Sequence, residues 1–165
     1  MLETVPYEII QHSSETEAFS YRIGKIRELI DRFKRDPKFI TLGKEILAGL
    51  NPSRVDLDYR VVLRIWQFMR SNVLFRRDVN GIETLQWPEY TLEHGGDCDC
   101  QIILAGTLME SQGVAVKQAV SMQKSSNEYD HIFLIIPAVR NLIFDPTNSV
   151  FDPNSGEYNN IEVVE

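Results

Sequence analysis

The stretch CDCQIILAGTLMESQG (residues 98–113) constrains the fold most strongly, because it is apolar around most of a helix. The apolar positions fall on nearly every side of a helical wheel: Ile102, Ile103, Ala105, Leu108 and Met109. A helix with this pattern is typical of one enclosed by other elements. Gly113 is placed to end it, since glycine favours the left-handed conformation just beyond a helix. We therefore predict a buried central helix around which the rest of the chain packs.

The chain before this helix shows helical spacing of apolar residues in three places. We predict helices over residues 17–35, 39–50 and 57–72, separated by Asp36-Pro37 and Asn51-Pro52. The third helix has one apolar face, made of Leu57, Val61, Ile65, Phe68 and Met69. The first helix has basic residues at Arg22, Lys25, Arg32 and Lys34. We interpret these as a solvated face, with a docking patch as the alternative.

Residues 73–96 lose the helical period and contain the Asn80-Gly81 turn sequence, a proline and three glycines. We predict an ordered loop here, with a short hairpin at Asn80-Gly81. A loop of this length inside a compact domain is uncommon and often functional.

The chain after the central helix is rich in strand signals. We predict strands over residues 114–122, 131–139 and 141–144, with a turn between Pro137 and Asn141. Helices followed by strands indicate an α+β fold with an antiparallel sheet packed on the central helix. We expect one domain over residues 1–165, with a helical part to residue 72, the loop of residues 73–96, and the central helix plus sheet over residues 97–165.

Composition narrows the class of protein. The chain has 165 residues, 43% of them hydrophobic, with 17 basic against 24 acidic residues and a net charge of −7. This balance argues against broad binding to nucleic acid or to anionic membranes. We find no signal-peptide pattern and no membrane-spanning run. With both cysteines expected to be free thiols, we predict a protein of a reducing compartment or one carried in a virion.

Cys98 is the candidate nucleophile, because it lies where the loop gives way to the buried helix. Unpaired backbone N–H groups and the helix dipole at such a start stabilise a thiolate and lower the thiol pKa. The flanking carboxylates of Asp97 and Asp99 act in the opposite direction. We expect both carboxylates to turn towards helix caps and backbone N–H groups, away from the sulfur.

A cysteine nucleophile needs a base, and the chain has three histidines: His12, His94 and His131. His131 opens an apolar strand, where its backbone is held by the sheet. Asp145 ends the next strand, so a hairpin turning between Pro137 and Asn141 brings the two residues onto adjacent strands. A carboxylate there can accept a hydrogen bond from the imidazole and fix its tautomer. His94 is interpreted as a loop residue rather than a second base.

The stretch GGDCDCQIILAGTLMESQGVAV resembles the signature of the transglutaminase-like superfamily, where Gly-x-Cys opens a buried helix followed by Gly and a small apolar strand. HIFLII and LIFDPT are similar to its His and Asp strands. FRRDVNGIETLQWPEYTL is similar to the subset encoded by bacteriophages and prophages, in which an Asp, Gly-x-Glu, Gln and Pro precede Gly-Asp-Cys-Asp-Asp. The likeness covers about residues 60–150.

The resemblance implies a papain-like fold with a transglutaminase core and a Cys98, His131 and Asp145 triad. Cys98 would be the nucleophile, His131 the general base and acid, and Asp145 the orienting carboxylate. It implies a cysteine peptidase or amidase that cleaves a protein or peptide amide through a thioester, with no cofactor and no metal. It also implies a place in the cytoplasm of a bacterial host or in a virion, where other phage or virion proteins are candidate partners.

Gln86 and Trp87 occupy the segment that holds an oxyanion donor in the resembling family. We favour Gln86, which would act with the backbone N–H of Cys98, and loop anchoring is the alternative for both residues. The chain departs from the subset at Cys100, where the family has a second Asp. We expect Cys100 to be an inert packed thiol, and we expect a Cys100→Asp exchange to leave the thiol chemistry intact.

Five other interpretations remain open. Cys98 is a buried inert thiol in the simplest of them. A zinc site could draw on His94, Cys98, Cys100 and His131, although the CxC spacing is unusual. A Cys98–Cys100 disulfide would close a strained ring. Finally, the fold could serve as a catalytically silent structural or binding module, or as a transglutaminase in which an amine captures the acyl group. Calcium-dependent crosslinking is not expected, because no calcium loop is visible.

Overall fold

The computed structural model describes residues 6–10, 15–79, 82–122, 129–152 and 158–164. Its helices are α1 (Glu15–Phe33), α2 (Pro37–Ile46), α3 (Leu57–Asn72), α4 (Pro88–His94) and α5 (Cys98–Ser111). Its strands are β1 (Tyr7–Ile10), β2 (Glu83–Gln86), β3 (Lys117–Met122), β4 (Tyr129–Ile136), β5 (Leu142–Phe144) and β6 (Asn159–Val164). Helices and antiparallel strands therefore combine in an α+β fold, as the sequence predicts. Among the described residues, no helix has the length and apolar character needed to cross a membrane.

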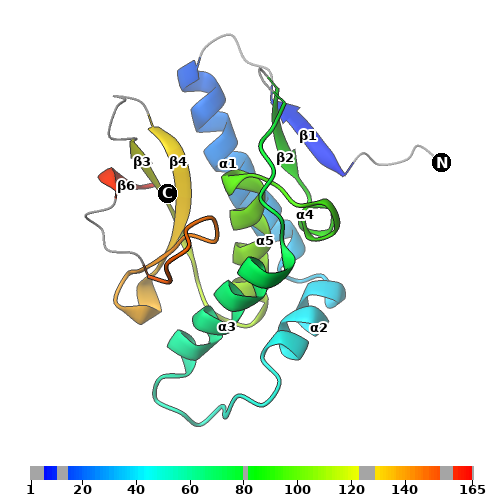
Figure 1. Cartoon of the computed structure of the whole chain (residues 1–165), viewed down its shortest axis with the longest axis vertical. Helices are drawn as coiled ribbons and strands as arrows, with labels where there is room; N and C mark the ends of the chain where they lie inside the picture. Colours follow the sequence, from blue (N-terminus) through cyan, green and yellow to red (C-terminus); the bar gives the residue numbers. More distant parts are fainter. Residues whose placement is uncertain (1–5, 11–14, 80–81, 123–128, 153–157, 165) are drawn as a thin grey trace, which may run out of the picture.

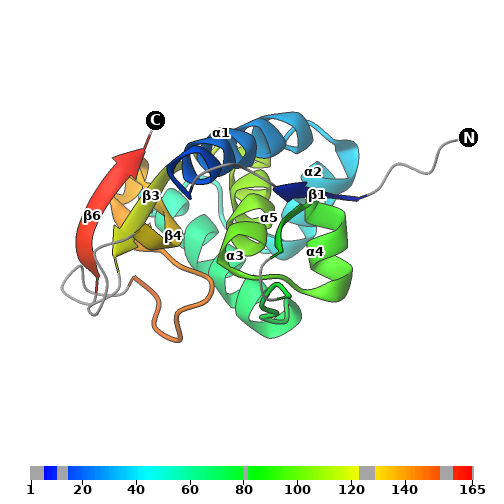
Figure 2. The ribbon, with the colours of Figure 1, turned by 90° about the horizontal axis from the view of Figure 1, so that it is seen from above.

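Helix α5 lies at the centre of the fold, between the larger sheet and the other helices (Figures 1 and 2). It contacts all four other helices as well as β2 and β4. Every residue of α5 from Asp99 to Met109 is buried. Asp97 caps the start of the helix, where its side chain accepts a hydrogen bond from the backbone N of Cys100 at 3.2 Å. Gly113 follows its end with a φ of 85°. The prediction of a buried central helix is confirmed.

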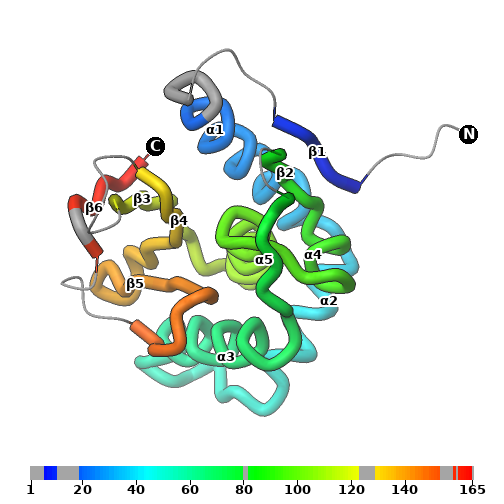
Figure 3. Tube along the Cα trace, turned by 45° about the horizontal axis from the view of Figure 1, so that its top comes forward, coloured from blue at the N-terminus to red at the C-terminus, as the bar shows by residue number. Residues whose placement is uncertain are grey.

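The larger sheet has the strand order β5-β4-β3-β6 and all its pairings are antiparallel. The tube view shows β5 at the edge of this sheet nearest α3 (Figure 3). Strand β4 is buried on both faces. Ile132, Leu134 and Ile136 belong to the main core with α5, while Phe133 and Ile135 belong to a second apolar cluster on the opposite face. This double burial explains the continuous apolar run HIFLII.

Helix α1 is tied to α5 by charged groups rather than left as a solvated face. Arg27 donates two hydrogen bonds to Glu110, at 2.8 and 2.6 Å, and Lys34 donates a third at 3.0 Å. Glu110 is only 11% exposed, so its charge needs these partners. Of the basic residues named in the prediction, Lys34 contacts Glu110 of α5 and Arg22 contacts Glu83 of β2, so a solvated face describes them only in part. The docking patch stays a prediction.

The segment 73–96 is not the continuous loop that the sequence suggests. It contains β2 and α4, and β2 pairs in antiparallel register with β1, from Tyr7↔Gln86 to Ile10↔Glu83. The N-terminal part is likewise not purely helical, since β1 precedes α1. Both strands are short and obtain their hydrogen bonds from a distant partner, so the local pattern gives little sign of them. The expected hairpin at Asn80-Gly81 lies outside the described residues.

Gly95 controls the turn between α4 and α5. Its φ of 80° and ψ of 176° fall in a region open essentially to glycine alone. A Cβ added there would overlap the carbonyl oxygen of Leu74, which accepts a hydrogen bond from Gly96 N at 3.0 Å and cannot easily move.

We expect Gly95→Ala to lower the free energy of unfolding by roughly 3 kcal/mol, because backbone strain and overlap add. Gly113→Ala is the matched control. Gly113 also has a positive φ, of 85°, but nothing lies within 4 Å of an added Cβ. It should therefore lose only about 1–2 kcal/mol. Urea unfolding measures both, and equal losses would contradict the role assigned to Leu74.

Candidate active site

Cys98 is the first residue of α5, where the sequence analysis expected a nucleophile. Its thiol donates a hydrogen bond to Oδ1 of Asp99 at 3.3 Å. The backbone of Ile132 in β4 also lies close enough to the sulfur to act on the thiol pKa. Since Ile132 follows His131 directly, this contact brings the start of α5 against the part of β4 that carries the candidate base.

The surroundings of Cys98 do not lower its pKa. Burial raises the pKa of the thiol well above its ordinary value, and the charges of Asp99 and Asp97 raise it further. The backbone of Ile132 acts in the opposite direction but is outweighed. The expectation that both carboxylates turn away from sulfur is correct for Asp97, which caps α5, and wrong for Asp99. Asp99 is 2% exposed and faces the interior, where it meets both the thiol and Arg22.

His131 and Asp145 come together as the predicted hairpin requires. Strands β4 and β5 pair from Leu134↔Phe144 to Ile136↔Leu142, and the turn between them runs through Pro137–Val139 and two residues with positive φ, Arg140 and Asn141. Asp145 follows the last residue of β5. Its Oδ2 lies 2.6 Å from Nε2 of His131. This contact occupies Nε2 and leaves Nδ1 as the ring nitrogen that can exchange a proton with another group.

The His131–Asp145 pair favours its charged form. Burial opposes protonation of His131, but the hydrogen bond and charge of Asp145 outweigh it, so the pKa of His131 is raised. Burial likewise works against an ionised Asp145, but its bonds with His131, Thr147 and Tyr158 outweigh this effect and lower its pKa. The His131 contribution to stability is therefore full below about pH 6.5 and is lost as pH rises through its folded pKa. The Asp145 contribution is present above about pH 3.9 and is lost as pH falls through its folded pKa.

Several groups that the sequence analysis did not single out hold Asp145 in place. Thr147 donates to its Oδ1 from both its backbone N, at 2.9 Å, and its hydroxyl, at 2.6 Å. The Tyr158 hydroxyl donates to Oδ2 at 2.9 Å, and its ring lies parallel to that of His131, with centroids 6.0 Å apart. The Trp66 indole N–H reaches the Asp145 carbonyl oxygen at 3.3 Å. The carboxylate that orients His131 is thus fixed from several directions.

Gln86 and Trp87 have different surroundings. The Gln86 side-chain oxygen accepts a hydrogen bond from the Thr91 hydroxyl at 3.1 Å and lies close to Gly96, two residues before Cys98. Trp87 instead packs against the end of α1. Its ring centroid is 5.5 Å from that of Phe33 and 4.6 Å from the guanidinium carbon of Arg32, and its buried indole N–H has no hydrogen-bond partner among the described residues. These contacts match the alternative of a loop anchor for Trp87.

The other candidate ligands of a metal site point to separate partners. Cys100 is fully buried, and its thiol donates to the Thr84 carbonyl oxygen at 3.4 Å. His94 is exposed, stacks on the Tyr90 ring and contacts the Tyr90 carbonyl oxygen. In the described part of the chain, no group of three or more His, Cys, Asp or Glu side chains is arranged to hold a metal ion, and both cysteines are free thiols.

Because Cys100 is buried, Cys100→Asp is a poor control for the thiol chemistry. A Cys100→Asp side chain would place a carboxylate against the Thr84 carbonyl oxygen in the core, which costs stability. Cys100→Ala removes the thiol without adding a charge.

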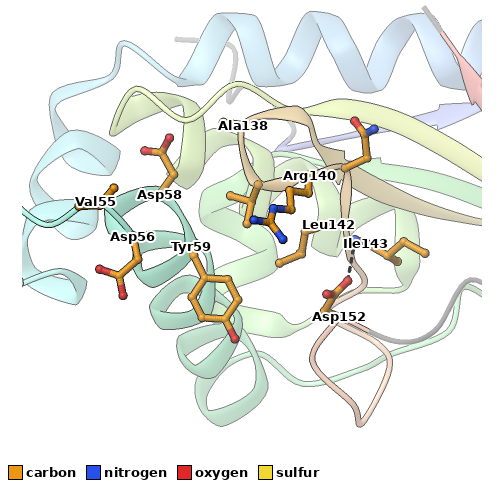
Figure 4. Close-up of a pocket in the computed structure, with 11 residues that line it drawn as sticks. Val55, Asp56, Asp58, Tyr59, Ala138, Arg140, Leu142, Ile143 and Asp152 are labelled. Atoms are coloured by element: carbon orange, nitrogen blue, oxygen red, sulfur yellow. Dashed lines mark hydrogen bonds between the residues drawn. The ribbon is translucent and has the colours of Figure 1, made fainter.

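Two hollows are found in the described surface, and Cys98, His131 and Asp145 line neither of them. One, of about 690 Å³, lies between the start of α3 and the β4–β5 turn (Figure 4). Two of its acidic residues are already engaged, since Asp56 pairs with Arg54 and Arg60 and Asp152 accepts from the backbone N of Ile143. The other, of about 390 Å³, lies between β1, residues 76–79 and α4, and includes Ile82 and Gln86.

Comparison with known proteins supports the fold alone. No protein-family model and no curated protein matches the chain. A solved structure from Cytophaga hutchinsonii, with a provisional assignment as a cysteine protease, aligns with a TM-score of 0.53 and 16% sequence identity. The alignment covers 96% of this chain and 60% of that protein, so the chain spans little more than half of its length. The fold is therefore similar to that of a protein assigned to the cysteine proteases.

We expect the NMR titration midpoint of His131 to lie above about 6.5, the ordinary value for histidine. In Asp145→Asn the midpoint should fall below that value, because the burial that opposes protonation is then no longer outweighed. The loss of one signal in His131→Gln assigns the resonance. Asp152→Asn serves as the control, since that carboxylate binds the backbone N of Ile143. A midpoint that is the same in the wild type and Asp145→Asn would exclude the pairing.

Proposed function

We propose that the protein is a thiol-dependent acyl-transfer enzyme, a cysteine peptidase or amidase of the transglutaminase-like superfamily that cleaves a protein or peptide amide. The observation that carries the proposal is the 2.6 Å hydrogen bond between His131 and Asp145. His131 lies on β4, the strand that packs against α5, and the backbone of the next residue, Ile132, acts on the Cys98 sulfur. The resemblance of residues 60–150 and the likeness of the fold to that of a protein assigned to the cysteine proteases agree with it.

In the proposed reaction, Nδ1 of His131 takes the proton of the Cys98 thiol as the sulfur attacks the carbonyl carbon of the amide. Asp145 keeps the imidazole in the tautomer that has Nδ1 free and stabilises the imidazolium. The C–N bond then breaks, the leaving amine takes the proton from His131, and a thioester on Cys98 remains. Water, deprotonated by His131, attacks the thioester, releasing a carboxylic acid and restoring the thiol.

The negative oxygen of the tetrahedral intermediate needs hydrogen-bond donors. We assign this role to the backbone N–H of Cys98, at the start of α5, and to the side-chain amide of Gln86, whose oxygen is occupied by Thr91. Trp87 is assigned to anchoring the segment before α4, because its ring contacts Arg32 and Phe33.

One observation favours a second candidate, a catalytically silent structural or binding module with the same fold. The Cys98 thiol gives its hydrogen bond to Asp99, and its surroundings raise its pKa. A resting thiol of this kind is a poor nucleophile until a base takes its proton.

If an amine instead of water attacks the thioester, the enzyme is a transglutaminase that shares the same first step. The resemblance to sequences from bacteriophages and prophages leads us to propose proteins of a bacterial host or of a virion as substrates and partners.

The test is hydrolysis of a library of fluorogenic peptide amides by the wild type, Cys98→Ala and Cys100→Ala. We expect the wild type to cleave a subset of the library and Cys98→Ala to lose at least about 10³-fold in kcat/KM, since no other group can form the thioester. His131→Ala should lose about 10²–10⁴-fold, the usual contribution of a general base.

Cys100→Ala is the matched control, because it removes the neighbouring thiol and should retain activity. Hydrolysis that survives in Cys98→Ala would overturn the proposal. A wild type that cleaves no peptide in the library would favour the silent module instead. Added amines that replace water in the product would identify the transferase.

A further inference from the structure

The contact between Cys98 and Asp99 has no part in the reaction proposed above. Asp99 is 2% exposed, and its two oxygens face different groups: Oδ1 accepts the hydrogen bond of the Cys98 thiol at 3.3 Å, and Oδ2 lies 3.3 Å from Nε of Arg22. Burying a carboxylate of this kind destabilises the folded state unless a cation balances its charge.

Arg22 reaches Asp99 from a distant part of the chain. It projects from α1, is 18% exposed, and also donates to Glu83 of β2 at 2.9 Å. Arg22 and Asp99 form an ion pair without a hydrogen bond. Although the two atoms are close enough for an ion pair, neither Nε of Arg22 nor Oδ2 of Asp99 has a hydrogen-bond partner among the described residues. Oδ2 is therefore a buried acceptor without a donor, and Asp99 keeps Oδ1 for the thiol.

We propose that Asp99, held by Arg22, is a lock on the nucleophile that keeps the Cys98 thiol in a resting state, protonated and bonded to a carboxylate instead of to His131. This lock would regulate the acyl-transfer site, and its biological role rests on the function proposed above. Substrate binding would have to break the Cys98–Asp99 bond before His131 could take the proton. Arg22 is a positioning residue in this scheme, because it acts through Asp99.

Titratable groups from every element packed around the site act on the sulfur or on the charged groups beside it. They are Asp97 at the N-cap of α5, Asp99 of α5, Arg22 of α1, Glu83 of β2, Asp78 before β2, His131 of β4 and Asp145 after β5. Burial and then Asp99 make the largest contributions to the raised pKa of Cys98. Removing the charge of Asp99 should therefore favour the thiolate, which is the reactive form.

The experiment measures the rate of alkylation of Cys98 by iodoacetamide as a function of pH, in a Cys100→Ala background where Cys98 is the only thiol. Asp99→Asn keeps the shape and an oxygen acceptor but removes the charge. We expect its alkylation midpoint to move about one unit to lower pH, with a rate at neutral pH that is about threefold to tenfold higher. Glu83→Gln is the control, since Glu83 binds Arg22 at the surface and does not contact the thiol. An unchanged profile for Asp99→Asn, or the same shift in Glu83→Gln, overturns the lock.

A second measurement tests Arg22 and guards against a variant that merely misfolds. Arg22→Gln should lower the melting temperature clearly in the wild type, because it leaves a buried carboxylate without its cation, and much less in Asp99→Asn. Lys25→Gln is the matched control on the same helix, since Lys25 pairs with Glu8 and Glu28. Equal losses in both backgrounds would show that Arg22 does not act through Asp99.

The alkylation profile does not require catalysis, so the two proposals can fail separately. If Asp99→Asn shifts the alkylation profile of Cys98 but the protein cleaves no peptide amide, the role of Asp99 is supported and the proposed activity is contradicted. If the protein cleaves peptide amides but Asp99→Asn leaves the alkylation profile unchanged, the proposed activity is supported and the role of Asp99 is contradicted.

Discussion

The enclosure of α5 is the constraint on which the rest of the structure depends. Its side chains from Asp99 to Met109 are buried on all sides, so helices and strands must surround it. The only part of such a helix that reaches the outside is an end. Its first residue, Cys98, is still partly exposed and lies against β4, the strand that carries His131. The same burial that fixes the sulfur in position also disfavours its charge, which makes the neighbouring charges decisive.

Two buried carboxylates, Asp145 and Asp99, have opposite effects on the proposed chemistry. Asp145, held by Thr147 and Tyr158, raises the pKa of His131 and so strengthens it as a base. Asp99 raises the pKa of Cys98 and so weakens it as a nucleophile. In the proposed scheme, Asp145 prepares His131 as the base, while Asp99 keeps the Cys98 thiol protonated until substrate binds.

The features that local sequence could predict are those whose causes are local. Helix α3 matches its predicted bounds, because the apolar face of Val61, Ile65 and Met69 follows the helical period. The β4–β5 hairpin follows from two apolar runs and a short turn, and it brings His131 to Asp145. Strand β1 could not be predicted in this way, since its partner β2 lies more than seventy residues away. The Arg22–Asp99 contact and the Tyr158 hydroxyl bond likewise depend on tertiary packing, because each joins elements that have no common local pattern.

The most direct measurement of the central claim is the site of acylation by a small activated ester, which needs no knowledge of the natural substrate. The protein is mixed with p-nitrophenyl acetate and the reaction is quenched in acid. Mass spectrometry then gives the number of acetyl groups on the intact protein, and peptide digestion locates the modified residue. If Cys98 is the nucleophile and His131 its base, one acetyl group should accumulate on Cys98, Cys100 should stay unmodified, and His131→Ala should acylate far more slowly. Acylation of Cys98 no faster than in the urea-unfolded chain, or unaffected by His131→Ala, would contradict the account.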